Sequence, residues 1–256
     1  MQYINQQLFS EDTRCGAFCI TYWEWINGKK QIPESTEYNR NLGEQQNENV
    51  KRFLDDLSKI YDTVKFKPED INILIEKMMN LPGLNDVDKN NVKKVIMVVM
   101  EMFEKFSNPI KMLSYLNILC KDFNVTLQTF NDKFGTLLIE LAKVNDNVDA
   151  TQIIYKDAID DLEEGEYAIL IFGADMNLLK VVPPFSMVVQ DGLEKIVESI
   201  GGLMPMHYIL VKGTGAGLEI LDPADGNLGA YGKNISGFTS AFPLKNMYTT
   251  IYIRKK

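Results

Sequence analysis

Hydrophobic positions recur at helical spacing through much of the first 145 residues. One such set lies on a single face of a helix, with members at i, i+3, i+4, i+7 and i+10: Val50, Phe53, Leu54, Leu57 and Ile60. A second helix is predicted to begin at Pro68, since proline suits the first helical position and acids follow it, and to end before Pro82-Gly83. Further helices are predicted over about 87–106, 111–122 and 127–144. This part of the chain is therefore expected to be a compact helical block.

An apolar, aromatic stretch precedes this block. Residues 15–26 stop at Asn27-Gly28, a pattern typical of a buried helix that ends at glycine. Cys15 would then lie in the first turn, where unpaired N–H groups and positive potential lower the pKa of a thiol. Residues 29–49 are polar, contain a proline and are expected to form a loop.

The pattern changes after residue 151. An amphipathic segment from Ile153 to Leu162 predicts a helix that leads into a buried strand at Tyr167–Phe172. Gly213–Gly217 is expected to join two strands as a hairpin, because a strand follows it and not the helix that a phosphate-binding loop requires. The remaining strands are predicted over 185–189, 207–212, 218–221 and 248–253. Helices followed by an antiparallel sheet indicate the α+β class.

Composition excludes several functions. The formal charge is −8 and Lys and Arg cluster only in the tail Arg254-Lys-Lys256, so nucleic acid is not an expected partner. No apolar run is long enough to span a bilayer, and the first residues lack a secretory signal, so we expect a cytoplasmic protein or one exported without a cleaved signal. Three cysteines without paired spacing indicate neither a disulfide framework nor a metal site, and no cofactor is expected.

One cysteine, one histidine and one acid stand at positions that suit nucleophilic catalysis. His207, the only histidine, opens a strand-like run, and Asp222 ends the next predicted strand across the hairpin. An imidazole that deprotonates the thiol of Cys15, itself oriented by a carboxylate, is the usual arrangement of such a site. Each residue also has a structural interpretation: a cysteine packed in the core, a half-buried histidine, or an acid that begins an Asp-Pro turn.

The remaining cysteines differ from Cys15 in their surroundings. Cys15 stands at a helix start and is followed by glycine, which favours the catalytic interpretation. Cys19 lies one turn later among aromatic residues, and Cys120 lies within a helical stripe. Both are expected to be packing residues.

Four segments resemble the papain-like cysteine peptidases: Arg14-Cys-Gly-Ala-Phe-Cys19, Ala158–Phe172, His207-Tyr-Ile-Leu-Val211 and Leu218-Glu-Ile-Leu-Asp-Pro-Ala-Asp-Gly226. Within that family the bacteriocin-processing type, whose members cut leader peptides after a double glycine, has the most similar pattern. The resemblance implies Cys15 as nucleophile, His207 as general base and acid, and Asp222 as the group that orients the imidazole.

The resemblance also implies a glutamine before the cysteine whose amide helps to bind the oxyanion. Gln7 is the first choice and Gln6 the alternative; the spacing from Gln7 to Cys15 exceeds the family's by about two residues. The similarity covers the first 25 or so residues and the last hundred. Residues 1–256 are therefore expected to form one papain-like domain with a helical insertion over about 45–145, which is a candidate for binding a partner or an inhibitor.

The expected function is that of a bacterial thiol protease: a thiol-dependent hydrolase that cleaves a peptide or amide bond of a peptide or protein substrate through an acyl-enzyme thioester. The same groups serve other thioester chemistry, namely that of a glutamine deamidase, a transglutaminase or a cell-wall amidase, including an exported effector. A catalytically silent papain-like binding module is the third alternative. The sequence leaves these alternatives open.

Overall fold

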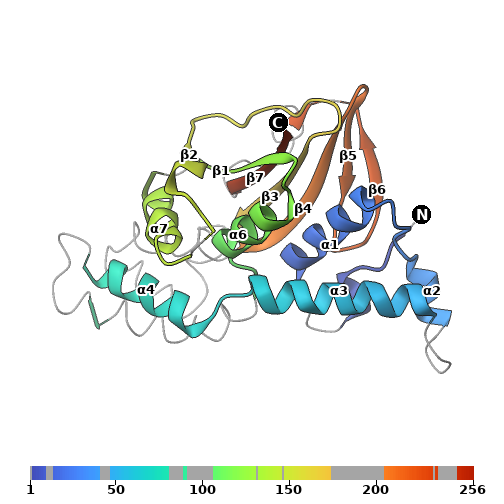
Figure 1. The fold of residues 1–256 in the computed structure, drawn as a ribbon, viewed down its shortest axis with the longest axis horizontal. Helices are drawn as coiled ribbons and strands as arrows, with labels where there is room; N and C mark the ends of the chain where they lie inside the picture. Colours follow the sequence, from blue (N-terminus) through green and yellow to red (C-terminus); the bar gives the residue numbers. More distant parts are fainter. Residues whose placement is uncertain are drawn as a thin grey trace.

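The fold is α+β, with one mixed sheet flanked by helices (Figure 1). The computed structural model describes residues 2–9, 14–40, 47–80, 89–90, 106–130, 132–145, 147–173, 205–232, 234–235 and 247–256. Its helices are α1 (Cys15–Asn27), α2 (Ser35–Arg40), α3 (Glu48–Val64), α4 (Pro68–Met79), α6 (Pro109–Leu119) and α7 (Asp132–Ala142), with 3-10 turns η1 (Gln6–Leu8) and η2 (Ala150–Gln152). Its strands are β1 (Phe123–Thr129), β2 (Ile153–Tyr155), β3 (Tyr167–Gly173), β4 (Pro205–Thr214), β5 (Gly217–Leu221), β6 (Leu228–Tyr231) and β7 (Met247–Lys255).

The seven described strands follow the order β2-β1-β7-β3-β4-β5-β6. Only the β1–β2 pair is parallel; every other neighbouring pair is antiparallel. β7 therefore lies between β1 and β3, two strands that come before it in the chain. Strand β2 borders the sheet at one end and β6 at the other.

Side chains alternate between the two faces of the sheet, as strand geometry requires. On one face Ile169, Leu210 and Ile251 belong to the main core, together with α1 and α6 (Figure 1). On the other face Leu170 and Val211 belong to a smaller apolar cluster. The helical side of the sheet therefore holds most of the described apolar core.

Helix α1 is the centre of that core. Its aromatic residues pack against α3, where the rings of Tyr22 and Phe53 lie 5.9 Å apart. The indole nitrogen of Trp25 donates a hydrogen bond to Asp56 of α3 at 3.1 Å. Because the helix is buried on nearly every side, its position relative to β4 is fixed by packing in all directions.

Several predicted elements are confirmed. The apolar stretch from Cys15 forms α1, with Cys15 as the first helical residue. The stripe at 50–60 lies in α3, Pro68 begins α4, and α6 lies close to the helix predicted over 111–122. Gly213–Gly217 joins β4 and β5 as a hairpin, with Thr214 opposite Gly217.

Other predictions are wrong. Residues 123–129 form β1, and the helix predicted from residue 127 begins at residue 132, so the sheet is mixed and not purely antiparallel. The segment Ile153–Leu162 holds the short strand β2 and no helix. Its apolar residues face different neighbours: Ile153 is buried, whereas Ile154 is exposed. The predicted loop 29–49 contains α2, and β6 was not predicted.

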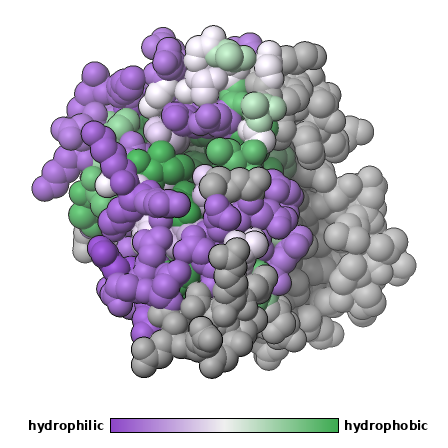
Figure 2. All heavy atoms as spheres, turned by 90° about the vertical axis from the view of Figure 1, so that its right-hand side faces the viewer, coloured by the Kyte–Doolittle hydropathy of each residue, from purple (hydrophilic) through white to green (hydrophobic). Residues whose placement is uncertain are grey.

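Two predicted elements fall outside the described residues. These are the helix over 87–106, of which the structure describes only residues 89–90 and 106, and the strand over 185–189. Within the described part, no helix combines the length and the apolar character that crossing a bilayer requires. The face at the end that carries α2 and β6 is mainly hydrophilic where it is described, with hydrophobic side chains gathered between the polar ones (Figure 2).

Candidate functional site

The β4–β5 hairpin brings His207 and Asp222 into contact. His207 is near the start of β4, and Asp222 follows the last residue of β5. Nε2 of His207 lies 2.7 Å from Oδ1 of Asp222, and both side chains are about 30% exposed (28% and 31%). A carboxylate only accepts hydrogen bonds, so Nε2 is the protonated nitrogen of this contact and Nδ1 is left for a second partner.

A tight turn orients the Asp222 carboxylate. The same Oδ1 accepts the main-chain N–H of Ala224 at 2.8 Å, and the Asp222 carbonyl accepts the N–H of Gly226 at 2.7 Å. Gly226 has a φ of 70°, a conformation that favours glycine. The sequence Asp-Pro-Ala-Asp-Gly thus builds a turn in which the carboxylate is held toward His207.

The N-terminal segment holds the other side of this turn. The amide of Asn5 donates to the carbonyl of Asp225 at 2.8 Å, and the main-chain N–H of Gln6 donates to the carbonyl of Pro223 at 2.8 Å. Gln6 therefore lies beside the Asp222 turn. Gln7 is exposed, and its main-chain N–H is bound to the Asn5 side chain. Which glutamine serves as an oxyanion donor stays a prediction.

Cys15 begins α1 and is buried, with 1% of its surface exposed. Burial raises the pKa of Tyr208 well above its usual value, and the neighbouring thiolate charges of Cys15 and Cys19 would raise it further. Cys15, Cys19 and Tyr208 belong to the same buried core, and Tyr208 comes directly after His207 in β4. The structure thus sets Cys15 at a helix N-terminus beside the strand that carries the histidine.

Ser107 joins the two sides of this site, and sequence reasoning did not single it out. Its carbonyl accepts a hydrogen bond from the Tyr208 hydroxyl at 2.5 Å. Its side chain packs so closely on α1 that a Cβ added at Gly16 would lie 2.6 Å from both Cβ and Oγ of Ser107. Ser107-Asn-Pro109 has the composition of a helix stop, and no local pattern reveals a contact with residues so distant in sequence.

The other two cysteines lie in surroundings that keep the thiol protonated. Burial raises the pKa of Cys19 well above its usual value, with smaller contributions from Cys15 and Asp222. Burial, with the nearby Glu24 charge, raises the pKa of Cys120 to about 12. A thiol with so high a pKa is a poor nucleophile at neutral pH, which agrees with a packing role for both residues.

The arrangement supplies a buried thiol at a helix N-terminus, an imidazole on the adjacent strand and a carboxylate held on that imidazole. Among the described residues, no group of three or more His, Cys, Asp or Glu side chains is placed to hold a metal ion. Such a set of groups is able to carry out acyl transfer through a thioester. In comparisons with known proteins, no model of a protein family, no curated protein and no solved structure matches this chain.

Proposed function

We propose that the protein is a thiol-dependent hydrolase of the papain-like type that cleaves a peptide or amide bond. The observation that carries the proposal is the 2.7 Å contact between His207 and Asp222, formed on the strand against which the Cys15 helix packs. A carboxylate that is held in place by a turn and bound to the imidazole is the arrangement that orients the histidine of a catalytic triad. The resemblance to leader-peptide peptidases adds a peptide as the substrate class.

In the proposed mechanism, Nδ1 of His207 takes the proton of the Cys15 thiol, while Asp222 stabilises the imidazolium through Nε2. The thiolate attacks the carbonyl carbon and forms a C–S bond. The oxyanion is held by the main-chain N–H of Cys15 and by a glutamine amide, from Gln6 or Gln7. His207 then gives the proton to the leaving amine as the C–N bond breaks. Water, deprotonated by His207, hydrolyses the thioester and releases the acid.

The test is the pH dependence of alkylation of Cys15 by iodoacetamide, with the modified cysteine identified by mass spectrometry. The parent protein is compared with His207→Ala, and Cys15→Ala shows how much labelling comes from other thiols. We expect reaction at neutral pH or below that slows strongly in His207→Ala. A Cys15 that reacts as an ordinary thiol, unchanged by His207→Ala, would refute the proposal.

A second measurement separates the chemistries that share a thioester. The parent protein and Cys15→Ala are incubated with a peptide library, and the products are analysed by mass spectrometry. New termini that require Cys15 support hydrolysis of peptide bonds. Glutamine side chains that gain about one mass unit without new termini support a deamidase instead.

A further inference from the structure

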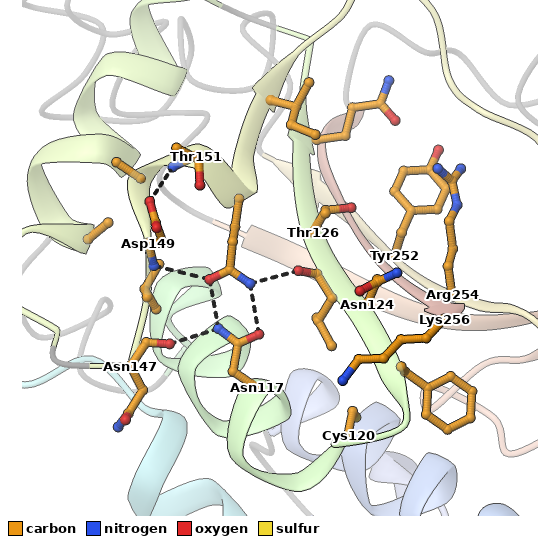
Figure 3. A pocket seen from close by; sticks show the side chains of 18 of the residues that line it. Asn117, Cys120, Asn124, Thr126, Asn147, Asp149, Thr151, Tyr252, Arg254 and Lys256 are labelled. Atoms are coloured by element: carbon orange, nitrogen blue, oxygen red, sulfur yellow. Dashed lines mark hydrogen bonds between the residues drawn. The ribbon is translucent and has the colours of Figure 1, made fainter.

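A large groove lies at the other end of the sheet, separated from His207 and Asp222 by strand β3. It has a volume of about 1210 Å³ and is built on β1 and β7, with walls from the end of α6, the η2 turn and the segment around Asp160 (Figure 3). Pockets for small molecules usually have volumes of roughly 300–1,000 Å³. The groove is therefore large enough for a segment of a polypeptide.

The groove carries positive charge in an acidic protein. Six cationic side chains line it against three carboxylates, whereas the whole chain has a formal charge of −8. The cations are Lys121, Lys143, Lys156, Arg254, Lys255 and Lys256, and the carboxylates are Asp149, Asp160 and Glu166. A local excess of cations over acids attracts an anionic partner to the groove, while the acidic remainder of the chain repels that partner elsewhere.

Two of the three carboxylates are paired with cations. Asp160 accepts hydrogen bonds from Lys156 at 2.6 and 2.9 Å, and Arg254 lies 3.3 Å from Asp160 and 3.8 Å from Glu166. Asp149 caps the η2 turn by accepting the N–H of Thr151. Lys143 is paired with Glu140 at 2.6 Å. Lys121, Lys255 and Lys256 therefore carry the positive charge that these carboxylates do not offset.

One wall is held rigid by a network of amides. Asn117 and Gln152 exchange two hydrogen bonds, of 2.9 and 3.0 Å, and Gln152 also donates to the carbonyl of Val125 at 2.9 Å (Figure 3). Asn117 donates in addition to the carbonyl of Asn147 at 2.7 Å. This wall is formed before any ligand binds, which lowers the entropic cost of binding.

The floor of the groove carries polar side chains that a ligand could contact. Asn124 and Thr126 of β1 lie beside Arg254 and Tyr252 of β7, their register partners, on the open side of the strands (Figure 3). Gln128, on the same face of β1, is only 2% exposed; its amide nitrogen donates to Ala158, but its Oε1 has no hydrogen-bond partner within the described part of the chain. Because this oxygen is buried, the polar side chains of β1 that a ligand in the groove would meet are those of Asn124 and Thr126.

We propose that this groove binds an acidic segment of a polypeptide in an extended conformation. Carboxylates of the segment would face Lys121 and Lys256, while its main-chain groups would pair with the side chains of Asn124 and Thr126 on β1. Next to the groove, the exposed edge residues Ile154 and Tyr155 give apolar contact for the same segment. The proposal does not depend on catalysis by Cys15.

The test uses the full chain with Cys15→Ala, so that the probe is not consumed. The probe is a fluorescein-labelled peptide of alternating Glu and Thr, about ten residues long, which spans roughly 33 Å when extended. Binding is followed by fluorescence anisotropy, and a peptide with Lys in place of Glu is the comparison. Lys121→Glu reverses a charge in the groove. Lys51→Glu makes the same charge change on the exposed side of α3 and is the matched control.

We expect the Glu-Thr peptide to bind more tightly than the Lys-Thr peptide and to bind more weakly as salt rises. Lys121→Glu should weaken binding about tenfold and Lys51→Glu less than twofold. Asn124→Trp, which fills the groove from an exposed position, should also weaken binding. The proposal is overturned if the peptide does not bind, or if the two lysine variants have equal effects. It is also overturned if single-stranded RNA displaces the peptide at a lower concentration than unlabelled peptide does.

Discussion

The hydroxyl of Tyr208 donates a 2.5 Å hydrogen bond to the main-chain carbonyl of Ser107, and both residues are fully buried. Tyr208 follows His207 in β4, whereas Ser107 packs on Gly16, the residue after Cys15. One contact therefore links the histidine strand to the start of the cysteine helix. In the proposed enzyme this link would fix the distance between thiol and imidazole.

Tyr208→Phe should loosen this link without opening a cavity. It leaves a buried carbonyl unpaired, at a cost of about 1–3 kcal/mol in the free energy of unfolding. Alkylation of Cys15 at neutral pH should also slow, because thiol and imidazole are held less precisely. Denaturant unfolding and alkylation rates measure the two effects.

Tyr22→Phe is the matched control, since the Tyr22 hydroxyl also donates a 2.5 Å bond to a main-chain carbonyl, that of Ile4. It should lower stability by a similar amount and slow alkylation less than Tyr208→Phe does, because its contact holds the segment before Gln6 and not the start of α1. Equal slowing in the two variants would show that the contact acts only on stability.

Asp222→Asn should impair hydrolysis while the turn persists, because the amide oxygen still accepts the Ala224 N–H. In serine enzymes the equivalent change lowers the rate by about 10⁴-fold, through the wrong imidazole tautomer. We expect a loss of about 100-fold or more in turnover of a substrate found by library screening. Asp225→Asn, in the same turn, is the control, since Asp225 binds Asn227 and not His207. A full rate in Asp222→Asn would remove Asp222 from the mechanism.

Gly16→Ala should destabilise the protein, because the new Cβ would lie 2.6 Å from Ser107. Overpacking of this kind costs about 1–3 kcal/mol. Ser107→Gly in the same chain removes the atoms in conflict and should recover part of that loss. Thermal unfolding of both single variants and the double variant gives the coupling energy, and additive effects would contradict the close packing.

Stability at acid pH should depend on Asp160. Burial of Asp160 opposes its ionisation, but Lys156 and Arg254 outweigh this and hold its pKa below the usual value. A lowered pKa stabilises the fold above the unfolded pKa, about 3.9, and this contribution is lost as pH falls through the folded value. Asp160→Asn should therefore lower the melting temperature at pH 7 and have little effect near pH 2. Asp157→Asn, an exposed acid nearby, is the control; equal pH profiles would contradict the prediction.

The sequence predicted those elements whose signals are local. Cys15 begins α1 and Pro68 begins α4 because helix starts depend on adjacent residues. The hairpin between β4 and β5 was predicted for the same reason, and from it the proximity of Asp222 to His207. The catalytic roles of these residues stay predictions.

Sequence patterns gave wrong predictions, or none, where residues distant in the chain determine the local structure. Leu127 lies in a strand because β7, more than a hundred residues later, pairs with it at Ile251. The apolar residues between Ile153 and Leu162 recur at the spacing of a helix face, yet Ile153–Tyr155 pairs with β1 as a strand. The groove was missed because its residues come from separate segments, and the Ser107 contact because it spans 101 positions.

The position of β7 has a consequence for how the fold is reached. Residues 247–255 complete the middle of the sheet, between strands that begin at residues 123 and 167. While the chain emerges from the ribosome, β1 and β3 have exposed edges until residues 247–255 arrive, and such edges favour aggregation. Because β7 pairs with strands that come far earlier in the chain, long loops must close late in folding. We therefore expect folding to be slow. A chain that stops before Met247 would split the sheet into two parts, leaving the His207–Asp222 pair on one part and only the β1 side of the groove on the other.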